Sequence, residues 1–144
     1  MLWVLLLAVA SVPTDSGSAP PSPSTTLQQF MPSEKESRTP AQRKISSQLL
    51  YEIYRLRGEA AQKGVPEGDT LVRVDEKTRA LVDVRAEVTP ALLEKVEKLG
   101  STIVSTSREY HSIVAWIPLM KLEGLAEDAA VRAIEPKAEA RTAK

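Results

Sequence analysis

The chain has 144 residues, which is enough for one domain and an appendage, and its 19 Lys and Arg balance its 19 Asp and Glu. It therefore lacks the basic excess that phosphate neutralisation requires, and we expect no nucleic-acid partner. The absence of cysteine excludes disulfides, thiolate catalysis and cysteine-ligated metal sites. Because aromatic residues make up only 4% of the chain, a core must be built from Val, Leu, Ile and Ala.

The first residues are typical of an exported protein. Residues 1–10 are almost entirely apolar and end in Ala8-Val9-Ala10, which has the form of a signal-peptide cleavage site. Spanning a bilayer takes roughly 20 apolar residues, so we expect no stable membrane insertion. We predict a secreted or periplasmic protein. Since no Lys or Arg precedes the segment, an accidental apolar patch in a disordered N-terminus remains the alternative.

Residues 11–40 are dominated by Ser, Thr and Pro and contain few large apolar side chains. Such a composition cannot bury enough surface to offset the entropy of ordering, so we predict a disordered leader. Residues 41–66 follow as an amphipathic segment. Apolar residues near helical spacing predict a helix from about 45 to 62, ended by Gly64 and Pro66. We expect it to pack on the following domain, with packing on another protein as the alternative.

Residues 68–136 alternate between strand and helix patterns. A first strand carries apolar residues in every second position, and residues 89–100 predict a helix with Thr89 as N-cap, Pro90 at its first position and Gly100 at its end. Two β-branched runs around a turn, a second helix near 119–129 and a short last strand complete the segment. We also expect a hairpin between residues 72–75 and the first strand. The strand–helix–strand–strand–helix–strand order predicts an α+β, ferredoxin-like unit, an antiparallel sheet with both helices on one face.

Chemistry is sparse in this sequence. His111 is the only histidine, and no motif supplies a Ser-His-Asp triad or a glycine-rich phosphate loop. The paired carboxylates lie on helix faces that we expect to be solvated. We therefore predict a protein that is not an enzyme, with no catalytic residues, no metal and no cofactor, and we place His111 in a turn or at a strand end.

The strands instead suggest a binding surface. In the first strand Val82 and Val84 belong to the apolar set, which turns Asp83 and Arg85 outward. In the strand of residues 112–117, Ile113, Ala115 and Ile117 form the better core set, which turns Val114 and Trp116 to the open face. An exposed Trp on a charged sheet is typical of an interface. The alternative is that the helix at 45–62 or the hairpin at 70–78 covers Trp116.

The run from "ALVDVRAEVTPALLEKVEKLG" to "SIVAWIPLMKLEGLAEDAAVRAIEP", after an export-like start, resembles the propeptide module of secreted bacterial subtilisin-like serine proteases. The resemblance covers about residues 68–136, and its markers are patterns of hydrophobicity and turns. No catalytic motif such as "GTSMA" occurs, so we expect either a free-standing propeptide-like protein or the N-terminal fragment of a longer protease.

The resemblance implies an inhibitor or intramolecular folding chaperone that binds a subtilisin-like serine protease in cis or in trans. In the family the open sheet face packs on the protease, and the C-terminal tail lies in the substrate cleft as a product-like strand. Residues 137–144 are the expected flexible tail, with small Ala138, Ala140 and Ala143. The expected partner-binding residues are Asp83, Arg85, Val114, Trp116, Glu135, Pro136, Lys137 and Ala138. A small-molecule-sensing or oligomerising module of the same fold is the alternative.

Overall fold

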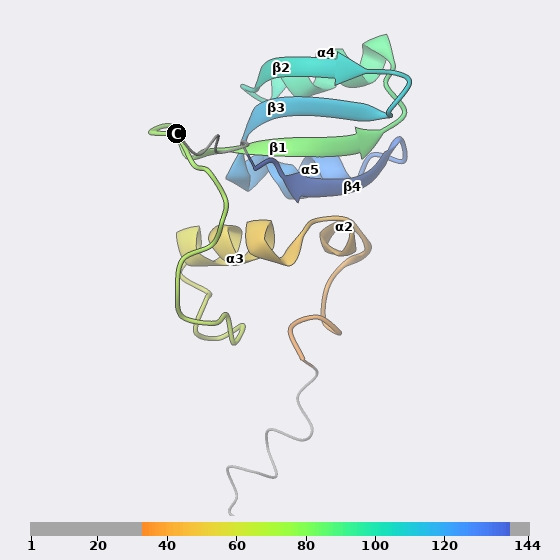
Figure 1. The fold of residues 1–144 in the computed structure, drawn as a ribbon. Coiled ribbons are helices and arrows are strands. Elements are labelled where there is room, and N and C mark those ends of the chain that lie inside the picture. The colour runs from red at the N-terminus through yellow and green to blue at the C-terminus, as the bar shows by residue number, and fades with distance from the viewer. Residues whose placement is uncertain (1–32, 139–144) are drawn as a thin grey trace, which may run out of the picture. The chain divides into compact units, whose positions relative to one another are not determined.

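The structure is a computed structural model that describes residues 33–138. The expected signal-like segment, most of the expected leader and residues 139–144 of the expected tail lie outside the described residues. The described chain forms an α+β fold with a four-stranded antiparallel sheet and a few helices (Figure 1). In chain order its elements are α2 (Pro40–Arg43), α3 (Ser47–Leu56), β1 (Arg79–Ala86), α4 (Pro90–Lys98), β2 (Thr102–Ser107), β3 (Ser112–Pro118), the 3-10 turn η1 (Leu119–Lys121), α5 (Leu122–Ala126) and β4 (Val131–Pro136).

The sheet has the strand order β2-β3-β1-β4, and each neighbouring pair is antiparallel. Helices α4 and α5 lie behind this sheet in Figure 1, so one face carries helices and the other is turned to the viewer. The central strand β1 places Val82 opposite Ala115 and Val84 opposite Ile113, and all four side chains are fully buried toward the helices. The alternation expected for both strands is confirmed, because a side chain every second residue reaches the same face.

Helix α4 is confirmed with the expected ends. The Thr89 side chain accepts a hydrogen bond from the Leu92 amide at 3.2 Å, and Pro90 occupies the first turn. Gly100 follows the helix with φ +84°, a left-handed conformation that glycine adopts without the steric cost of a Cβ. Local chemistry at both ends therefore determines the length of this helix.

The amphipathic helix is shorter than the expected 45–62. It ends at Leu56, because Gly58 adopts φ +72° and the Glu59 amide donates to the Tyr54 carbonyl at 2.8 Å. This hydrogen bond closes a Schellman-type end, which takes the chain out of the helix six residues before the expected stop. The second expected helix is also shorter and consists of η1 and the five residues of α5.

The chain before α3 closes the outer edge of β4. Ile45 forms a parallel bridge with Ile134, the Ser46 amide donates to the Ile134 carbonyl at 2.9 Å, and the Ile134 amide donates to the Lys44 carbonyl at 2.7 Å. Helix α3 contacts β4 and η1, and it buries Leu49, Leu50, Ile53 and Tyr54 in the same core as the sheet. The expectation that this helix packs within its own chain is confirmed.

Residues 33–40, which we expected to belong to a disordered leader, form an ordered turn against α3. The Arg38 guanidinium binds the Glu34 carboxylate through two hydrogen bonds of 2.7 Å, and the Tyr54 hydroxyl donates to the same carboxylate at 3.2 Å. The turn is thus attached to a buried residue of the helix. The composition of residues 33–40 does not predict this turn, because its attachment to α3 depends on three specific side chains.

Among residues 33–138, no helix has the length and apolarity needed to cross a membrane.

Candidate partner-binding surface

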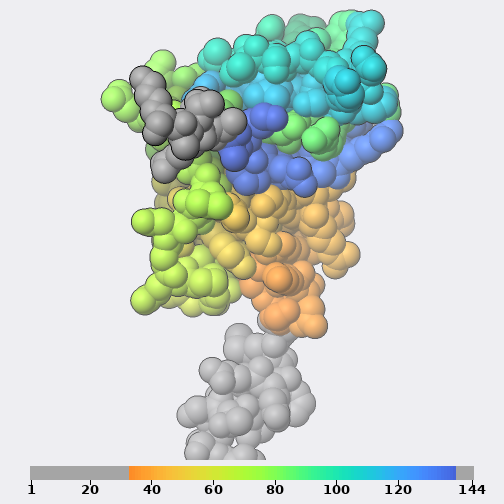
Figure 2. All heavy atoms as spheres, viewed as in Figure 1, coloured from red at the N-terminus to blue at the C-terminus, as the bar shows by residue number. Residues whose placement is uncertain are grey.

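The face of the sheet opposite α4 and α5 is the candidate site. On β1 it carries Leu81, Asp83 and Arg85, which lie opposite Trp116, Val114 and Ser112 of β3 in the antiparallel register. Figure 2 shows this face from the front, with the side chains of the four strands at its surface. In the register, Thr102 and Ser105 of β2 and Glu135 of β4 extend it to both sides. The expected set Asp83, Arg85, Val114, Trp116 and Glu135 therefore shares one face.

Trp116 is half-buried, and a segment that we call the arm, residues 70–78, contributes to its cover. The guanidinium carbon of Arg73 lies 5.9 Å from the centroid of the Trp116 ring, at the outer limit of a cation–π contact. Of the two intrachain covers expected from the sequence, the structure therefore shows the hairpin in contact with this ring. The remaining exposed part of Trp116, together with half-buried Val114, is the apolar centre of the open face.

The arm pairs with the beginning of β1. Val74 forms an antiparallel bridge with Ala80, the Asp75 amide donates to the Arg79 carbonyl at 2.9 Å, and the Leu81 amide donates to the Arg73 carbonyl at 3.1 Å. The Asp75 carboxylate also binds the Arg79 guanidinium at 2.7 Å. The expected hairpin is thus present as a short arm that contains a single bridge. The arm pairs with the beginning of β1, on the stretch of its edge that β4 does not reach.

Asp83 is placed on the open face as expected, but its carboxylate is not exposed. The residue is 6% exposed, and its Oδ1 accepts a 2.6 Å hydrogen bond from the Ser112 hydroxyl. Its Oδ2 lies 3.4 Å from the Arg85 guanidinium, which is itself half-exposed. A central strand with neighbours on both sides leaves little room for solvent around a short side chain. Of this pair, Arg85 is therefore the group that can reach a partner.

The four expected residues at the C-terminal end separate into different positions. Glu135 is exposed and lies opposite Asp83, whereas Pro136 lies opposite Val82 and so turns toward the helix side. The Lys137 amide donates to the Leu81 carbonyl at 2.9 Å, which keeps the chain on β1 for one residue beyond β4. Lys137 and Ala138 are exposed. Of these four residues, the register thus places Glu135 on the open face and Pro136 on the helix side, whereas Lys137 and Ala138 lie beyond the end of β4.

His111 lies in the turn before β3 with φ +49°. Its Nδ1 is 3.5 Å from the Glu87 carboxylate, which also binds Arg132, and all three side chains are largely exposed. These contacts connect the turn before β3 with the end of β1 and with β4. Within residues 33–138, no group of three or more His, Asp or Glu side chains is placed to hold a metal ion.

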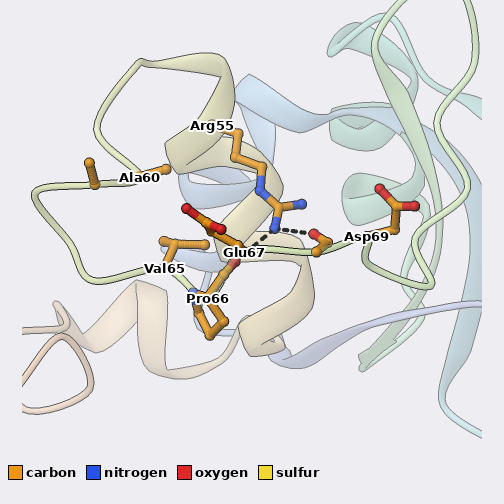
Figure 3. A pocket seen from close by; sticks show the side chains of 8 residues that line it. Arg55, Ala60, Val65, Pro66, Glu67 and Asp69 are labelled. Atoms are coloured by element: carbon orange, nitrogen blue, oxygen red, sulfur yellow. Dashed lines mark hydrogen bonds between the residues drawn. The ribbon is translucent and has the colours of Figure 1, made fainter.

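A hollow of about 530 Å³ lies between the end of α3 and residues 60–69 (Figure 3). The Arg55 guanidinium crosses it and donates to the carbonyls of Pro66 at 3.1 Å and Gly68 at 2.6 Å, as well as to Glu52 at 2.9 Å. The positively charged guanidinium in this hollow is thus already hydrogen-bonded to groups of the protein itself. Its hydrogen bonds hold residues 66–68 against α3, upstream of the arm.

Three further residues contribute to the open face and were not among the expected partner-binding residues, namely Leu81 of β1, Ser112 of β3 and Arg73 of the arm. The period-two pattern could have placed Leu81 beside Asp83, since both occupy odd positions of β1. Nothing in the sequence could have placed Arg73 over Trp116, because the two residues are far apart along the chain.

No protein-family model matches this chain, and no curated protein and no solved structure matches it.

Proposed function

We propose that this chain is a propeptide-like module that binds a subtilisin-like serine protease, in cis or in trans, as an inhibitor, a folding chaperone or both. The open face docks on the surface of the protease, and the residues that follow Lys137 enter its substrate cleft. We further propose that the fold is the ferredoxin-like split unit. The order β2-β3-β1-β4 supports this assignment, because two interleaved strand–helix–strand units place their first strands in the centre.

The observation that carries the proposal is the combination of the open face with the end of β4. Helices cover one face of the sheet, whereas the other presents half-buried Trp116 and Val114 with Arg85 and Glu135 beside them. Aromatic residues and Arg are the side chains most enriched among interface hot spots, and a polar surround around them excludes water.

The tail follows directly from this face. The chain leaves the sheet at Lys137, whose amide is bonded to β1, and Ala138 is exposed at that point. An extended peptide in a protease cleft pairs its backbone with the edge of the enzyme and places alternate side chains in subsites. The small side chains of Ala138, Ala140 and Ala143 suit shallow subsites. Export, as predicted from residues 1–10, would bring the chain to the compartment of a secreted protease.

The test is inhibition of purified bacterial subtilisin by the full chain. We expect slow-dissociating, active-site-directed inhibition that is competitive with a peptide substrate. A variant in which Gly and Ser replace residues 138–144 at equal length should lose most of it, whereas the sheet should stay intact because β4 ends at Pro136. Glu135 and Pro136 are kept because they belong to β4. Replacing them would disrupt the strand, and a loss of inhibition could then come from the fold as well as from the tail.

Trp116→Ala is the second variant, and we expect about a 30-fold weaker inhibition constant from the loss of a hot-spot contact. Leu56→Ala at the end of α3, where Leu56 is 47% exposed, is the control and should change inhibition less than about twofold. Inhibition that survives replacement of the tail would overturn the cleft-occupying mechanism. A chain that binds neither subtilisin nor any other subtilisin-like protease would overturn the proposed function.

A further inference from the structure

We infer that the arm, residues 70–78, is a second part of the docking surface, and that Leu71 enters an apolar depression on the protease beside its substrate cleft. The inference rests on the proposed function and adds a specificity-determining contact to it. Figure 1 shows the arm crossing from the α3 region to the beginning of β1. Three features of the arm carry the inference, namely the exposure of Leu71, its position beside the tail and its attachment at both ends.

Leu71 is 81% exposed, more than any other large apolar side chain among the described residues. It lies at a bend, two residues before Arg73, whose guanidinium lies over Trp116 of the open face. Val72, between them, is half-buried and packs against the core. The arm thus carries an uncovered Leu close in sequence to the residue that contacts Trp116.

The backbone of Leu81 joins the arm to the exit of the tail. Its amide donates to the Arg73 carbonyl at 3.1 Å, and its carbonyl accepts from the Lys137 amide at 2.9 Å. The amide and the carbonyl of one strand residue point to the same side, so the arm and Lys137 meet at one point of the β1 edge. A protease that receives the residues after Lys137 in its cleft must therefore lie close to the arm.

The arm is held on both sides of Leu71, which lowers the entropic cost of using it in binding. Before Leu71, the Thr70 hydroxyl donates to Glu52 of α3 at 2.5 Å, and Arg55 binds the Gly68 carbonyl. After it, Asp75 binds both the amide and the guanidinium of Arg79. An exposed Leu on a segment fixed in this way is pre-positioned rather than free to fold back on the chain. The complementary feature on the partner is apolar, since Leu offers no hydrogen bond and no charge.

The experiment measures the inhibition constant of the full chain against bacterial subtilisin for wild type, Leu71→Ser and Leu56→Ser. Leu56, which is 47% exposed at the end of α3, is the matched control for loss of an exposed Leu away from the open face. We expect Leu71→Ser to weaken inhibition about tenfold and Leu56→Ser to change it less than about twofold. Both variants should keep the circular-dichroism spectrum and the urea midpoint of the wild type, because neither side chain is buried.

The outcomes separate the two proposals. If the wild type inhibits through its tail and Leu71→Ser inhibits equally well, the arm is not part of the interface and the inference is overturned, while the proposed function stands. If Leu56→Ser weakens inhibition as much as Leu71→Ser, the effect is not specific to the arm and the inference is likewise overturned. If the wild-type chain does not inhibit subtilisin-like proteases, the proposed function and the inference are both overturned.

Discussion

Arg73 of the arm and Trp116 of β3 are in contact, with 5.9 Å between the guanidinium carbon and the centroid of the ring. The two residues lie on segments that are distant along the chain, and β1 brings them together because it pairs with both. The amide of its residue Leu81 donates to the Arg73 carbonyl, and Leu81 lies opposite Trp116 in the register of β1 and β3. Trp116 is therefore covered by a segment that reaches it only because both pair with β1.

Arg73→Ala should expose Trp116 to solvent. We expect a red shift of its emission and stronger acrylamide quenching, measured in a Trp3→Phe background so that Trp116 is the only Trp. The free energy of unfolding should fall by about 0.5–1 kcal/mol, the usual size of a solvent-accessible cation–π contact. Arg108→Ala, in the turn at the opposite end of β3, is the control and should leave the quenching unchanged. Equal quenching in Arg73→Ala and wild type would contradict the contact.

Glu34→Gln should destabilise the protein at neutral pH. Burial alone would raise the pKa of the Glu34 carboxyl, but the hydrogen bonds and charge of Arg38 outweigh burial, and with the Tyr54 hydroxyl they lower that pKa. The Glu34 and Arg38 side chains are only 9% and 10% exposed, so we expect urea unfolding to show a loss of about 1–3 kcal/mol. The control Glu94→Gln breaks an ion pair of the same spacing that is 65% and 74% exposed, and it should cost less than about 0.5 kcal/mol.

The pH dependence of this variant has a defined sign. A carboxyl whose pKa is lowered in the folded state stabilises the protein above the unfolded pKa, and the stabilisation is lost as the pH falls through the folded pKa. The difference in unfolding free energy between wild type and Glu34→Gln should therefore be constant near neutral pH and shrink below about pH 4.5, the ordinary value for Glu. A difference that persists undiminished at pH 2 would show that the charge of Glu34 is not its cause.

Ionisation of the Tyr54 hydroxyl should destabilise the protein at alkaline pH. Burial, followed by the negative charge of Glu34, raises the pKa of its hydroxyl from 10 to about 12. A group whose pKa is raised on folding stabilises the protein below the unfolded pKa and loses that contribution as the pH rises through the folded pKa. The free energy of unfolding should therefore fall between pH 10 and about 12, and Tyr54→Phe should lack that part of the decline. Absorbance at 295 nm measures the titration, and a wild type and a variant with identical alkaline profiles would contradict this assignment.

Two glycines should respond to Ala in opposite directions. Gly100 ends α4 with φ +84°, so a Cβ there meets the left-handed penalty, and Gly100→Ala should lower the free energy of unfolding by about 1 kcal/mol. Gly124 lies inside α5 without a positive φ, and an added Cβ would meet nothing within 4 Å. Gly124→Ala should therefore raise the free energy of unfolding by about 0.5–1 kcal/mol. Thermal unfolding of the two variants measures both changes, and a shift of the same sign in both would contradict the backbone argument.

The elements that depend on local chemistry could be predicted from the sequence. Helix α4 has its N-cap, its proline and its terminal glycine within twelve residues, so each end is determined by neighbouring atoms. The alternation in β1 and β3 likewise assigned the core side of both strands correctly, because side chains on a strand change face at every residue. The helix before them was predicted too long, because the prediction placed its end at Gly64 and Pro66, whereas the left-handed Gly58 ends it after Leu56.

The site could be predicted only in part. Asp83, Arg85, Val114, Trp116 and Glu135 share a face as expected, because alternation and antiparallel pairing are sufficient to place them there. The burial of the Asp83 carboxylate could not be foreseen, since it depends on the Ser112 hydroxyl of the neighbouring strand. The binding role of these residues stays a prediction, to be tested through the tail, Trp116 and Leu71.

The sequence by itself determined the α+β composition, the caps of α4 and the two faces of the sheet, because each depends on contacts within a few residues or on a period of two. Only the tertiary structure decided what meets across long separations in the chain. It placed Arg73 over Trp116, attached residues 33–38 to Tyr54 and closed the edge of β4 with residues 44–46. Such contacts depend on which strands become neighbours, and strand order is set by the packing of the whole core rather than by any local pattern.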